Sequence, residues 1–343
     1  MKKYNVAILG ATGAVGKEFL ELIEERNFPF AELKLLASSR SAGKKIDFMG
    51  KTYTVEEAKP ESFENVQIAL FAGGAASKTL APEAVKRGAV VIDNSSAFRM
   101  DPKVPLVIPE VNPEAIKEHQ GIIANPNCST IIMLMALKPI YDKAKIKRVV
   151  VSTYQAVSGA GKEAIDELEN QVVAHIQRAP VEANILPGAS LPKHYQIAFN
   201  LLPQIDVFVD GDYTKEEMKM VHETHKILGD HTIGISPTAV RVPVFRSHSE
   251  SINLELAEPL SAQEARELLS AFPGVVVEDA PADMVYPMPL LTSGKNDVAV
   301  GRIREDKSVP YGLNLWVVGD QIRKGAALNA LQIAEYMIGH NLV

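Results

Sequence analysis

The sequence predicts two domains, an α/β domain with a parallel sheet followed by an α+β domain with a mostly antiparallel sheet. Three observations predict them. The chain has 343 residues, more than one hydrophobic core usually contains. Its first third alternates short apolar runs with helix-like segments, as a parallel sheet covered on both faces requires. Its later part contains a segment in which polar and apolar residues alternate, as in a half-buried antiparallel strand.

The elements expected in the first domain follow each other at short intervals. Val6–Leu9 is an apolar strand, and Val15–Glu25 has helical periodicity. Further strands are expected at 33–37, 67–72 and 89–93, with a helical crossover at 82–87. Because a helical crossover connects strands that run in the same direction, the sheet should be parallel.

The second domain is expected to begin with a strand at 148–154 and a helix at 162–176. Ser261 and Glu264 form a capping-box pattern that opens a helix ending near Phe272. Strands are expected at 249–256, 298–304 and 313–318, and a final helix at 325–338. We expect this helix to return to the first domain, which gives domains of 1–126 with 321–343, and 127–320.

The composition excludes several classes of protein. Hydrophobic residues make up 46% and charged residues 23%, a globular balance, and the net charge of -6 gives no nucleic-acid footprint. No apolar run reaches the ~18 residues of a membrane span. The N-terminal residues leave no room for a signal peptide, and one cysteine excludes an internal disulfide. A cytoplasmic protein without nucleic-acid or membrane partners is expected.

A glycine-rich turn separates the first expected strand from the first expected helix. Residues 10–16 read Gly-Ala-Thr-Gly-Ala-Val-Gly. Glycine lets the backbone approach a pyrophosphate closely, and a helix N-terminus presents free N–H groups and a positive dipole. The spacing is GxxGxxG and not GxGxxG, so the position between strand and helix carries the prediction. We expect a Rossmann-like domain whose dinucleotide contacts Gly10, Thr12, Gly13, Ala14 and Val15.

The end of the second expected strand indicates which dinucleotide binds. NAD enzymes usually place Asp or Glu there, to hold the ribose hydroxyls. This chain has Ser38, Ser39, Arg40 and Ser41, followed by two lysines at 44–45. Hydroxyls and a guanidinium suit the 2′-phosphate of NADP, which a carboxylate would repel. The residues favour NADP, with a solvated basic loop as the alternative.

The single cysteine, Cys128, precedes an apolar segment at 131–137 that reads as a buried helix. At or just before a helix N-terminus, free N–H groups and the dipole favour thiolate over thiol. The same N–H groups suit an oxyanion formed when the thiolate attacks a carbonyl. A lone cysteine is as often a small buried hydrophobe, so its position alone leaves both interpretations open.

Four segments resemble the aspartate-semialdehyde dehydrogenase family. Residues 94–99 read NSSAFR, residues 125–130 NPNCST, residues 154–161 YQAVSGAG, and residues 241–244 RVPV with His248 shortly after. Each is moderately specific alone, but their order and spacing are highly specific, and the resemblance covers nearly the whole chain. It implies a second domain like that of glyceraldehyde-3-phosphate dehydrogenase, which serves catalysis and dimerisation in a homodimer or homotetramer.

The resemblance also implies a reaction. The thiolate of Cys128 attacks L-aspartyl-4-phosphate and expels inorganic phosphate, which leaves a thioester. Reduction by NADPH then yields L-aspartate-4-semialdehyde, in the biosynthesis of lysine and diaminopimelate, threonine, methionine and isoleucine. No metal is implied.

Roles for further residues follow from the same resemblance. His248 is expected to be the general acid/base, because imidazole titrates near working pH. Gln155 is expected to orient the substrate carbonyl or thioester by a neutral hydrogen bond. Ser158, Gly159 and Gln321 are expected to help seat the cofactor.

Substrate contacts are implied for a set of mostly charged residues. Arg241 is expected to grip the α-carboxylate and Glu216 to pair with the α-ammonium, while Arg99 and Lys219 hold the phosphate. Glu216 and Lys219 are three residues apart, so on a helix they share one face. Without the resemblance they would be read as an ordinary surface pair.

The positions of Arg241 and His248 carry a geometric requirement. Seven residues apart, they would face opposite sides of one unbroken strand. If both face one pocket, a turn or bulge must separate them, and Pro243 and Ser247 favour such an interruption.

Two other interpretations compete. N-acetyl-γ-glutamyl-phosphate reductase uses the same thioester chemistry, but its family carries a His-Pro-Gly-Cys segment where this chain has Asn-Pro-Asn-Cys at 125–128. A non-catalytic NADP-binding sensor should have lost the nucleophile, the base or a substrate contact, and the chain retains all of them.

Overall fold

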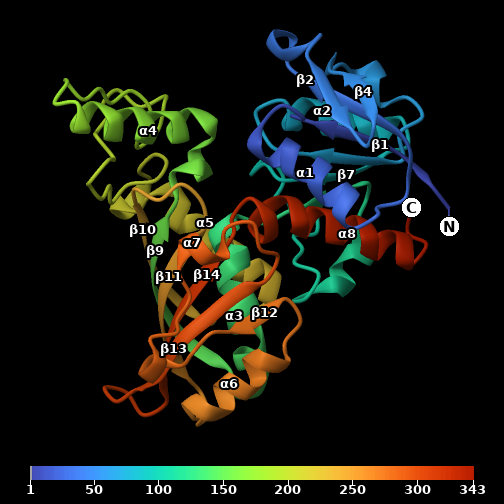
Figure 1. Cartoon of the computed structure of the whole chain (residues 1–343). Helices are drawn as coiled ribbons and strands as arrows, with labels where there is room; N and C mark the ends of the chain where they lie inside the picture. Colours follow the sequence, from blue (N-terminus) through green and yellow to red (C-terminus); the bar gives the residue numbers. More distant parts are fainter. Residues whose placement is uncertain (1) are drawn as a thin grey trace. The chain divides into compact units, whose positions relative to one another are not determined.

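The structure is a computed structural model that describes residues 2–343 and contains two compact units (Figure 1). The first unit comprises Met1–Asn127 and Gly325–Val343, and the second comprises Cys128–Lys324. The chain thus returns to the first unit at Gly325 and not at Gln321 as expected. Asp320 and Gln321 stay with the second unit because their side chains bind Arg246 and Ser247.

The first unit is built on a six-stranded sheet with the order β5-β2-β1-β6-β7-β8, and every neighbouring pair is parallel. This confirms the parallel sheet predicted from the alternating pattern. Its strands are β1 (Tyr4–Leu9), β2 (Phe30–Ala37), β5 (Glu56–Glu57), β6 (Ile68–Phe71), β7 (Val90–Asp93) and β8 (Ile122–Ala124). A hairpin of β3 (Lys45–Phe48) and β4 (Lys51–Thr54) was not predicted, because its short strands are largely polar and exposed.

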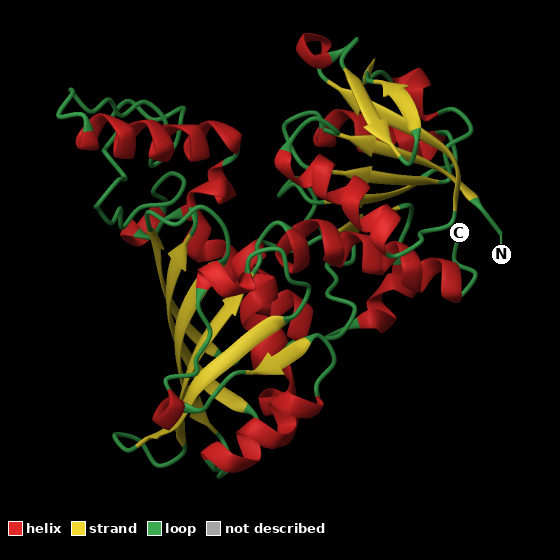
Figure 2. Ribbon diagram, viewed as in Figure 1, coloured by secondary structure: helices red, strands yellow, loops and turns green. Residues whose placement is uncertain are grey.

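Helices cover both faces of this sheet (Figure 2). Val6 and Ile8 of β1 face one apolar core, with α1 (Ala14–Glu25) and α8 (Leu328–Gly339). Ala7 and Leu9 face the opposite core, with α2 (Ser77–Lys86). The near-continuous apolar strands are explained by this burial on both faces. The C-terminal helix packs against α1, as the sequence predicted when it returned this segment to the first domain.

The second unit contains a six-stranded mixed sheet with the order β10-β9-β11-β14-β13-β12. The central pairs are antiparallel, whereas the edge strands β10 and β12 pair in parallel with their neighbours. The strands are β9 (Ile146–Gln155), β10 (Gly234–Arg241), β11 (His248–Leu256), β12 (Val275–Val277), β13 (Val298–Asp306) and β14 (Gly312–Gly319). β10 contains Pro237, which an edge strand tolerates and which hides the strand from sequence reasoning.

Three long helices pack against this sheet, namely α3 (Cys128–Ala144), α5 (Lys215–Leu228) and α6 (Ala262–Ala271). All residues from Ile131 to Leu137 of α3 are buried, which confirms the predicted buried helix. The remaining helices are α4 (Lys162–Ile176) and the short α7 (Pro289–Thr292). Within residues 2–343, no helix is both long enough and apolar enough to span a membrane. Nor do the described His, Cys, Asp and Glu side chains form a group of three or more suited to a metal.

Candidate active site

Cys128 is the first residue of α3 and its thiol, which forms no disulfide, is partly exposed, whereas the helix behind it is buried. The predicted position at a helix N-terminus is confirmed. The positive guanidinium of Arg241 lies within electrostatic range of Cys128. A helix N-terminus and a nearby cation both favour the thiolate, which is the nucleophilic form of cysteine.

Three predicted site residues lie side by side on neighbouring strands. Arg241, the last residue of β10, pairs with Gln155, the last residue of β9. On the other side of β9, Tyr154 pairs with Ser249 of β11, so Gln155 lies beside His248. The Nε2 atoms of Gln155 and His248 are 3.3 Å apart. The sheet register therefore brings Arg241, Gln155 and His248 into one row.

The interruption predicted between Arg241 and His248 is confirmed. β10 ends at Arg241 and β11 begins at His248, and residues 242–247 form an irregular connection. Ser247 has a φ of +73°, a left-handed conformation that serine rarely adopts. This connection reverses the chain direction, so that both side chains reach the same end of β9.

The imidazole of His248 is fully buried, and the hydrogen bond to its Nδ1 defines its tautomer. The backbone N–H of Ala156 donates to Nδ1 at 3.0 Å. Nδ1 must therefore carry the lone pair, and in the neutral ring the proton resides on Nε2. Burial and, to a smaller extent, the Arg241 charge lower the pKa of His248 to about 3, with partial opposition from Glu216. The ring is neutral at physiological pH, with Nε2–H as its donor.

The amide of Gln155 is oriented at both ends. Its Oε1 accepts from Thr153 Oγ1 at 3.0 Å, and its Nε2 donates to Glu216 Oε1 at 3.2 Å. Gln155 is buried, so these bonds set the direction of its amide. In the Nε2–H tautomer of His248, the Nε2 atoms of both residues are donors, so neither donates to the other across their 3.3 Å separation.

Arg241 is buried and its guanidinium is only partly satisfied. Nη1 donates to the carbonyl oxygen of Ala156 at 2.8 Å, but the buried Nε has no hydrogen-bond partner among the residues that the structure describes. Burial lowers the pKa of Arg241, whereas Glu216 and Cys128 raise it. A buried N–H without a partner is costly, and an anionic ligand would relieve that cost.

Glu216 and Lys219 form the predicted pair on one face of α5. Glu216 Oε2 accepts from Lys219 Nζ at 2.9 Å, and Asp206 Oδ2 accepts from the same Nζ at 3.1 Å. Burial alone would lower the pKa of Lys219, but the two carboxylates outweigh it and raise that pKa. The lysine therefore stays charged in a half-buried position. Asp206 belongs to no recognisable motif and was not predicted.

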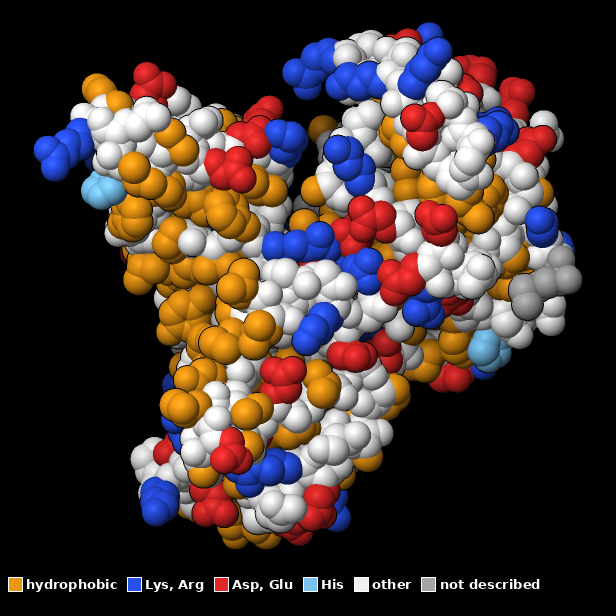
Figure 3. Space-filling model, viewed as in Figure 1, with side chains coloured by type: hydrophobic (Ala, Val, Ile, Leu, Met, Phe, Trp, Pro, Cys, Tyr) orange, Lys and Arg blue, Asp and Glu red, His pale blue; other side chains and the backbone are white. Residues whose placement is uncertain are grey.

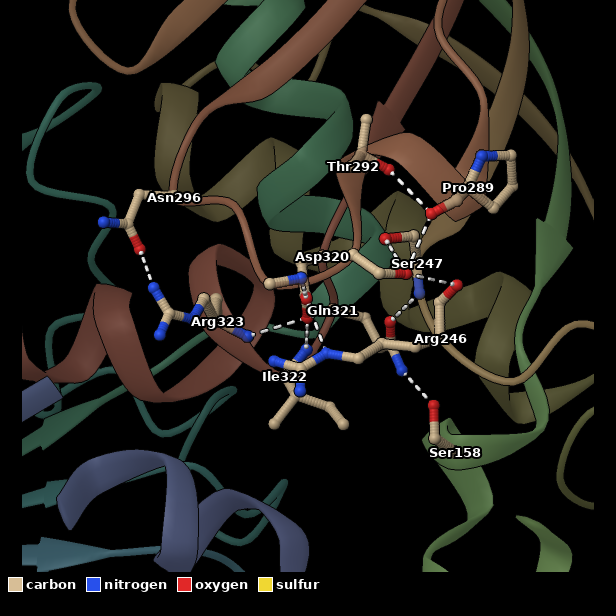
Figure 4. Close-up of polar contacts among 12 residues, drawn as sticks. Ser158, Arg246, Ser247, Pro289, Thr292, Asn296, Asp320, Gln321, Ile322 and Arg323 are labelled. Carbon is tan, nitrogen blue, oxygen red and sulfur yellow. Dashed lines mark hydrogen bonds and ion pairs between the residues drawn. The ribbon is translucent and has the colours of Figure 1, made fainter. Parts of the chain in front are cut away.

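Gly159 lies against the row of site residues. A Cβ atom built on Gly159 would be 2.8 Å from Arg241 Nη1 and 3.4 Å from His248 Nε2. Any side chain at this position would therefore displace one of them. Ser158 and Gln321, predicted with Gly159 to seat the cofactor, bind each other through Ser158 Oγ and Gln321 Nε2 (Figure 4).

Arg99 belongs to the first unit, where it joins the segments that follow β7 and β8. Its Nε donates to the carbonyl oxygen of Asn125 at 2.9 Å, and its Nη2 donates to that of Asn94 at 2.8 Å. Arg99 is buried, so these contacts fix its guanidinium at the carboxyl ends of the parallel strands.

The glycine-rich turn has the geometry that a dinucleotide requires. Gly10 has a φ of +84°, and its N–H and that of Ala11 donate to the carbonyl oxygen of Leu36. A Cβ atom on Gly16 would be 2.2 Å from the carbonyl oxygen of Gly10, so only glycine lets α1 start this close to the turn. Gly13 caps α1 without a side chain that would block its N–H groups.

The segment after β2 is exposed and carries hydroxyl and basic groups. Residues 39–41 form a short 3₁₀ helix, and Lys44 Nζ donates to Ser41 Oγ at 3.5 Å. Figure 3 shows Lys and Arg side chains gathered near β2 and β4. These groups can hold a phosphate on the adenosine ribose, and no carboxylate occurs between Ser38 and Lys45 to repel it.

The first unit has a parallel sheet with a dinucleotide turn, and the second has a thiol near an arginine that shares a row with a histidine. Together these features define a nicotinamide-dependent dehydrogenase that acts through cysteine. The comparisons with known proteins agree with this class. The sequence model "Semialdehyde dehydrogenase, NAD binding domain" matches residues 5–119, and "Semialdehyde dehydrogenase, dimerisation domain" matches residues 137–324. The chain belongs to the aspartate-semialdehyde dehydrogenase family.

Individual relatives are similar over their full length. The chain is 58% identical to aspartate-semialdehyde dehydrogenase of Aquifex aeolicus over 344 residues, which covers 99% of each. It is 54% identical to that of Bacillus subtilis over 341 residues, again covering 99% of each. Aspartate semialdehyde dehydrogenase II of Vibrio cholerae, solved in complex with ASA, superposes with a TM-score of 0.93 at 50% identity, covering 98% of this chain and 99% of that one. The Candida albicans enzyme, solved with NADP, has a TM-score of 0.77 at 26% identity and full coverage of both.

Proposed function

We propose that the protein reduces L-aspartyl-4-phosphate to L-aspartate-4-semialdehyde with NADPH and releases inorganic phosphate, through a thioester on Cys128. The observation that carries this proposal is the row of Arg241, Gln155 and His248, with Cys128 close to the arginine charge and Glu216 beside the glutamine. The aldehyde product serves the biosynthesis of lysine and diaminopimelate, threonine, methionine and isoleucine.

Cys128 is the proposed nucleophile. Its thiolate attacks the acyl carbon, and the tetrahedral adduct collapses with loss of phosphate to give the thioester. The free N–H groups at the start of α3 stabilise the oxyanion that forms during attack. When bound, NADPH supplies the hydride that reduces the thioester carbon. Collapse of the resulting thiohemiacetal releases the aldehyde and restores the thiolate.

In these reaction steps, His248 acts first as a proton donor. Because Ala156 N–H occupies Nδ1, the neutral ring presents Nε2–H, which can give its proton to the thiohemiacetal oxygen and recover it on collapse. Gln155, with its amide fixed by Thr153 and Glu216, donates a neutral hydrogen bond that orients the substrate carbonyl.

The charged residues bind the amino acid end and the phosphate. The unpartnered Nε of Arg241 suits the α-carboxylate, and Glu216 suits the α-ammonium, so the site selects a free amino acid. Lys219, kept charged by Glu216 and Asp206, and Arg99 from the first unit bind the phosphate. This charge pattern favours aspartyl phosphate over an N-acetylated substrate, which lacks the ammonium group.

The first unit holds the cofactor. Gly10, Thr12, Gly13, Ala14 and Val15 surround the pyrophosphate, and the closed turn at Gly16 fits that role. The 2′-phosphate is bound by the exposed hydroxyl and basic groups Ser38, Ser39, Arg40 and Ser41. Ser158, Gly159 and Gln321 contact the nicotinamide end. A catalytic thiolate at Cys128 is best preserved in a reducing compartment, which supports a cytoplasmic enzyme.

The second unit assembles a homodimer. On the sheet face opposite α3, Ser251 is exposed and Ser152, Tyr154 and Trp316 are partly exposed, although the Trp316 indole N–H donates to the carbonyl oxygen of Pro287. Figure 3 shows a band of hydrophobic side chains over β10 and β9. Large hydrophobic residues exposed in this unit include Phe199, Leu201, Phe208, Phe245, Tyr286, Met288, Leu290 and Leu291. Apolar surface of this extent marks a protein interface, in agreement with the description of the matching domain.

The reverse reaction tests the proposal. NADP reduction is followed with L-aspartate-4-semialdehyde, with and without inorganic phosphate, in the native enzyme and in Cys128→Ser. NADPH should form only with phosphate, and the substitution should abolish its formation, because the weakly acidic hydroxyl is a poor nucleophile.

Other outcomes would identify the competing functions. Oxidation of N-acetylglutamate semialdehyde, without reaction of the aspartate aldehyde, would keep the thioester chemistry and refute the substrate. Binding of NADP without reaction of either aldehyde would point to a non-catalytic sensor.

A further inference from the structure

Two buried residues that follow β14, Asp320 and Gln321, bind the connection between β10 and β11 (Figure 4). The carboxylate of Asp320 accepts from Arg246 Nε and from Gly294 N, both at 2.6 Å. It also accepts from two backbone N–H groups of its own turn, at 2.9 and 3.1 Å. The carboxylate therefore fixes the turn that carries Gln321.

The amide of Gln321 joins Ser247, the residue before His248, to the turn that follows Ala156, whose N–H donates to His248. Its Oε1 accepts from the backbone N–H of Ser247 at 2.8 Å, and its Nε2 donates to Ser158 Oγ at 2.5 Å. Gln321, Ser247 and Ser158 are all buried, so water does not compete for these bonds.

The first bond restrains an unfavourable backbone conformation. Ser247 has a φ of +73°, where its Cβ atom is crowded by its own backbone. Such conformations persist only when surrounding contacts enforce them. Gln321 supplies such a contact on the N–H of Ser247, and His248 is the next residue. The conformation of Ser247 therefore sets the direction from which the imidazole enters the site.

The second bond restrains the turn that selects the tautomer of His248. Ser158 lies in a 3₁₀ turn at Val157–Ala160 that follows Ala156, the residue whose N–H donates to Nδ1. The N–H groups of Val157 and Ser158 donate to the carbonyl oxygens of Val244 and Phe245, which ties this turn to the connection before His248. The Gln321 amide thus restrains both the backbone that leads into His248 and the turn next to Ala156, whose N–H determines which ring nitrogen carries the proton.

We propose that Gln321 is a positioning residue for the imidazole of His248, holding Ser247 in its left-handed conformation and keeping the ring in the Nε2–H tautomer. Without the Gln321 bonds, Ser247 relaxes toward extended backbone, and Nδ1 loses its alignment with the Ala156 N–H. This inference rests on the proposed function, because it assigns Gln321 an effect on the proposed acid/base.

The test uses the full-length enzyme with Gln321→Leu, which keeps the size of the side chain and removes both hydrogen bonds. The direct readout is ¹⁵N NMR of the histidine rings, with the His248 signals assigned by substitution. The native enzyme should show one Nε2–H tautomer for His248, and the variant a mixture. The turnover number should fall by on the order of 10²-fold, because small displacements of a catalytic group cost that much. Because Gln321 is also proposed to contact the nicotinamide end of NADP, turnover is measured at saturating NADP and the Kd for NADP is measured separately.

Two further variants sharpen the result. Asn296→Leu removes an amide from the same cluster, where Asn296 Oδ1 accepts from Arg323 Nη1 on the side away from Ser247, and it should leave turnover and tautomer unchanged. Ser247→Gly combined with Gln321→Leu should recover part of the lost turnover, because glycine adopts a positive φ without steric cost. If Gln321→Leu does not fold, Ser158→Ala removes the Nε2 contact alone and should shift the tautomer partially.

Some outcomes overturn the proposal. A weaker Kd for NADP, with the native tautomer and native turnover at saturating NADP, would make Gln321 a cofactor contact only. Lost turnover with an unchanged tautomer, or no recovery by Ser247→Gly, would refute positioning through Ser247. If the native enzyme fails to reduce aspartyl phosphate, the proposed function fails, while the NMR comparison still decides whether Gln321 orders His248.

Discussion

Glu250 carries a carboxyl group that is fully buried on β11, two residues from His248 and on the same face of the strand. Neither of its oxygens has a hydrogen-bond partner within residues 2–343. Burial raises the pKa of Glu250 well above its usual value, so the protonated form is favoured in the folded protein. Glu250 lies on the strand predicted at 249–256 and alternates in step with Ile252 and Leu254, so the pattern places it on the buried face despite its charge.

Replacing Glu250 by glutamine should stabilise the protein increasingly as pH rises. The unfolded carboxyl releases its proton above its ordinary pKa, whereas the folded one retains it, so the native protein loses stability as pH rises toward the folded pKa. Glutamine does not ionise, and the advantage of the variant should grow by at most about 1.4 kcal/mol per pH unit in that range. Urea unfolding at pH 5 and pH 8 measures this difference.

Glu255→Gln, on the same strand but at a position that reaches solvent, is the control for loss of a carboxyl group. A gain for Glu250→Gln that is equal at both pH values would mean that the folded carboxyl is ionised and that burial does not control it.

At the scale of elements, the start of α5 positions the charged end of the site. Thr214 and Glu217 form a capping box, in which Thr214 Oγ1 accepts from Glu217 N and Glu217 Oε2 accepts from Thr214 N. The other carboxylate oxygen of Glu217 accepts from Ala239 N of β10 at 2.9 Å. The cap thereby anchors the first turn of α5, which carries Glu216, to the strand that carries Arg241.

Thr214→Ala should lower both stability and activity. Loss of an N-cap typically costs about 1 kcal/mol, and the freed first turn should also move Glu216, which raises KM for the semialdehyde several-fold. Ser261→Ala removes the equivalent capping box of α6, which lies away from the site residues, and should lower stability alone. Urea unfolding and steady-state kinetics measure both effects. Equal KM values in the two variants would show that the cap of α5 does not position Glu216.

The elements themselves were predictable to different degrees. Apolar runs such as Val6–Leu9 and Ile131–Leu137 carry strong local signals, because each is buried on several sides. β10 was missed because of its proline, and the exposed hairpin β3–β4 because polar strands lack an apolar period. The strand order of the second sheet could not be predicted from the sequence either, since contacts between distant segments determine which strands pair.

At the scale of the whole molecule, the open face of the second sheet is where we expect a second subunit. Ser251 lies on this face between Ser152 of β9 and Trp316 of β14, and its side chain is exposed. Ser251→Arg should place an unpaired charge in the proposed interface and shift the protein from dimer to monomer. Analytical ultracentrifugation measures the mass in solution, and Ser270→Arg on the exposed side of α6 is the matched control. If the Ser251→Arg variant remains a dimer, the interface lies on another surface of the protein.

The sequence by itself determined the parallel sheet with its glycine-rich turn, the cysteine at a helix start, the need for a break between Arg241 and His248, and the family. These depend on local spacing, which a single strand, turn or helix expresses directly. Only the tertiary structure decided which side chains share the site and in what state. The row of Arg241, Gln155 and His248 depends on strand register, the Nε2–H tautomer on a backbone N–H of another segment, and the left-handed Ser247 on Gln321. Hydrogen bonds between residues 74 and 92 positions apart leave no periodic trace in the chain, so they become visible only when the fold brings those segments together.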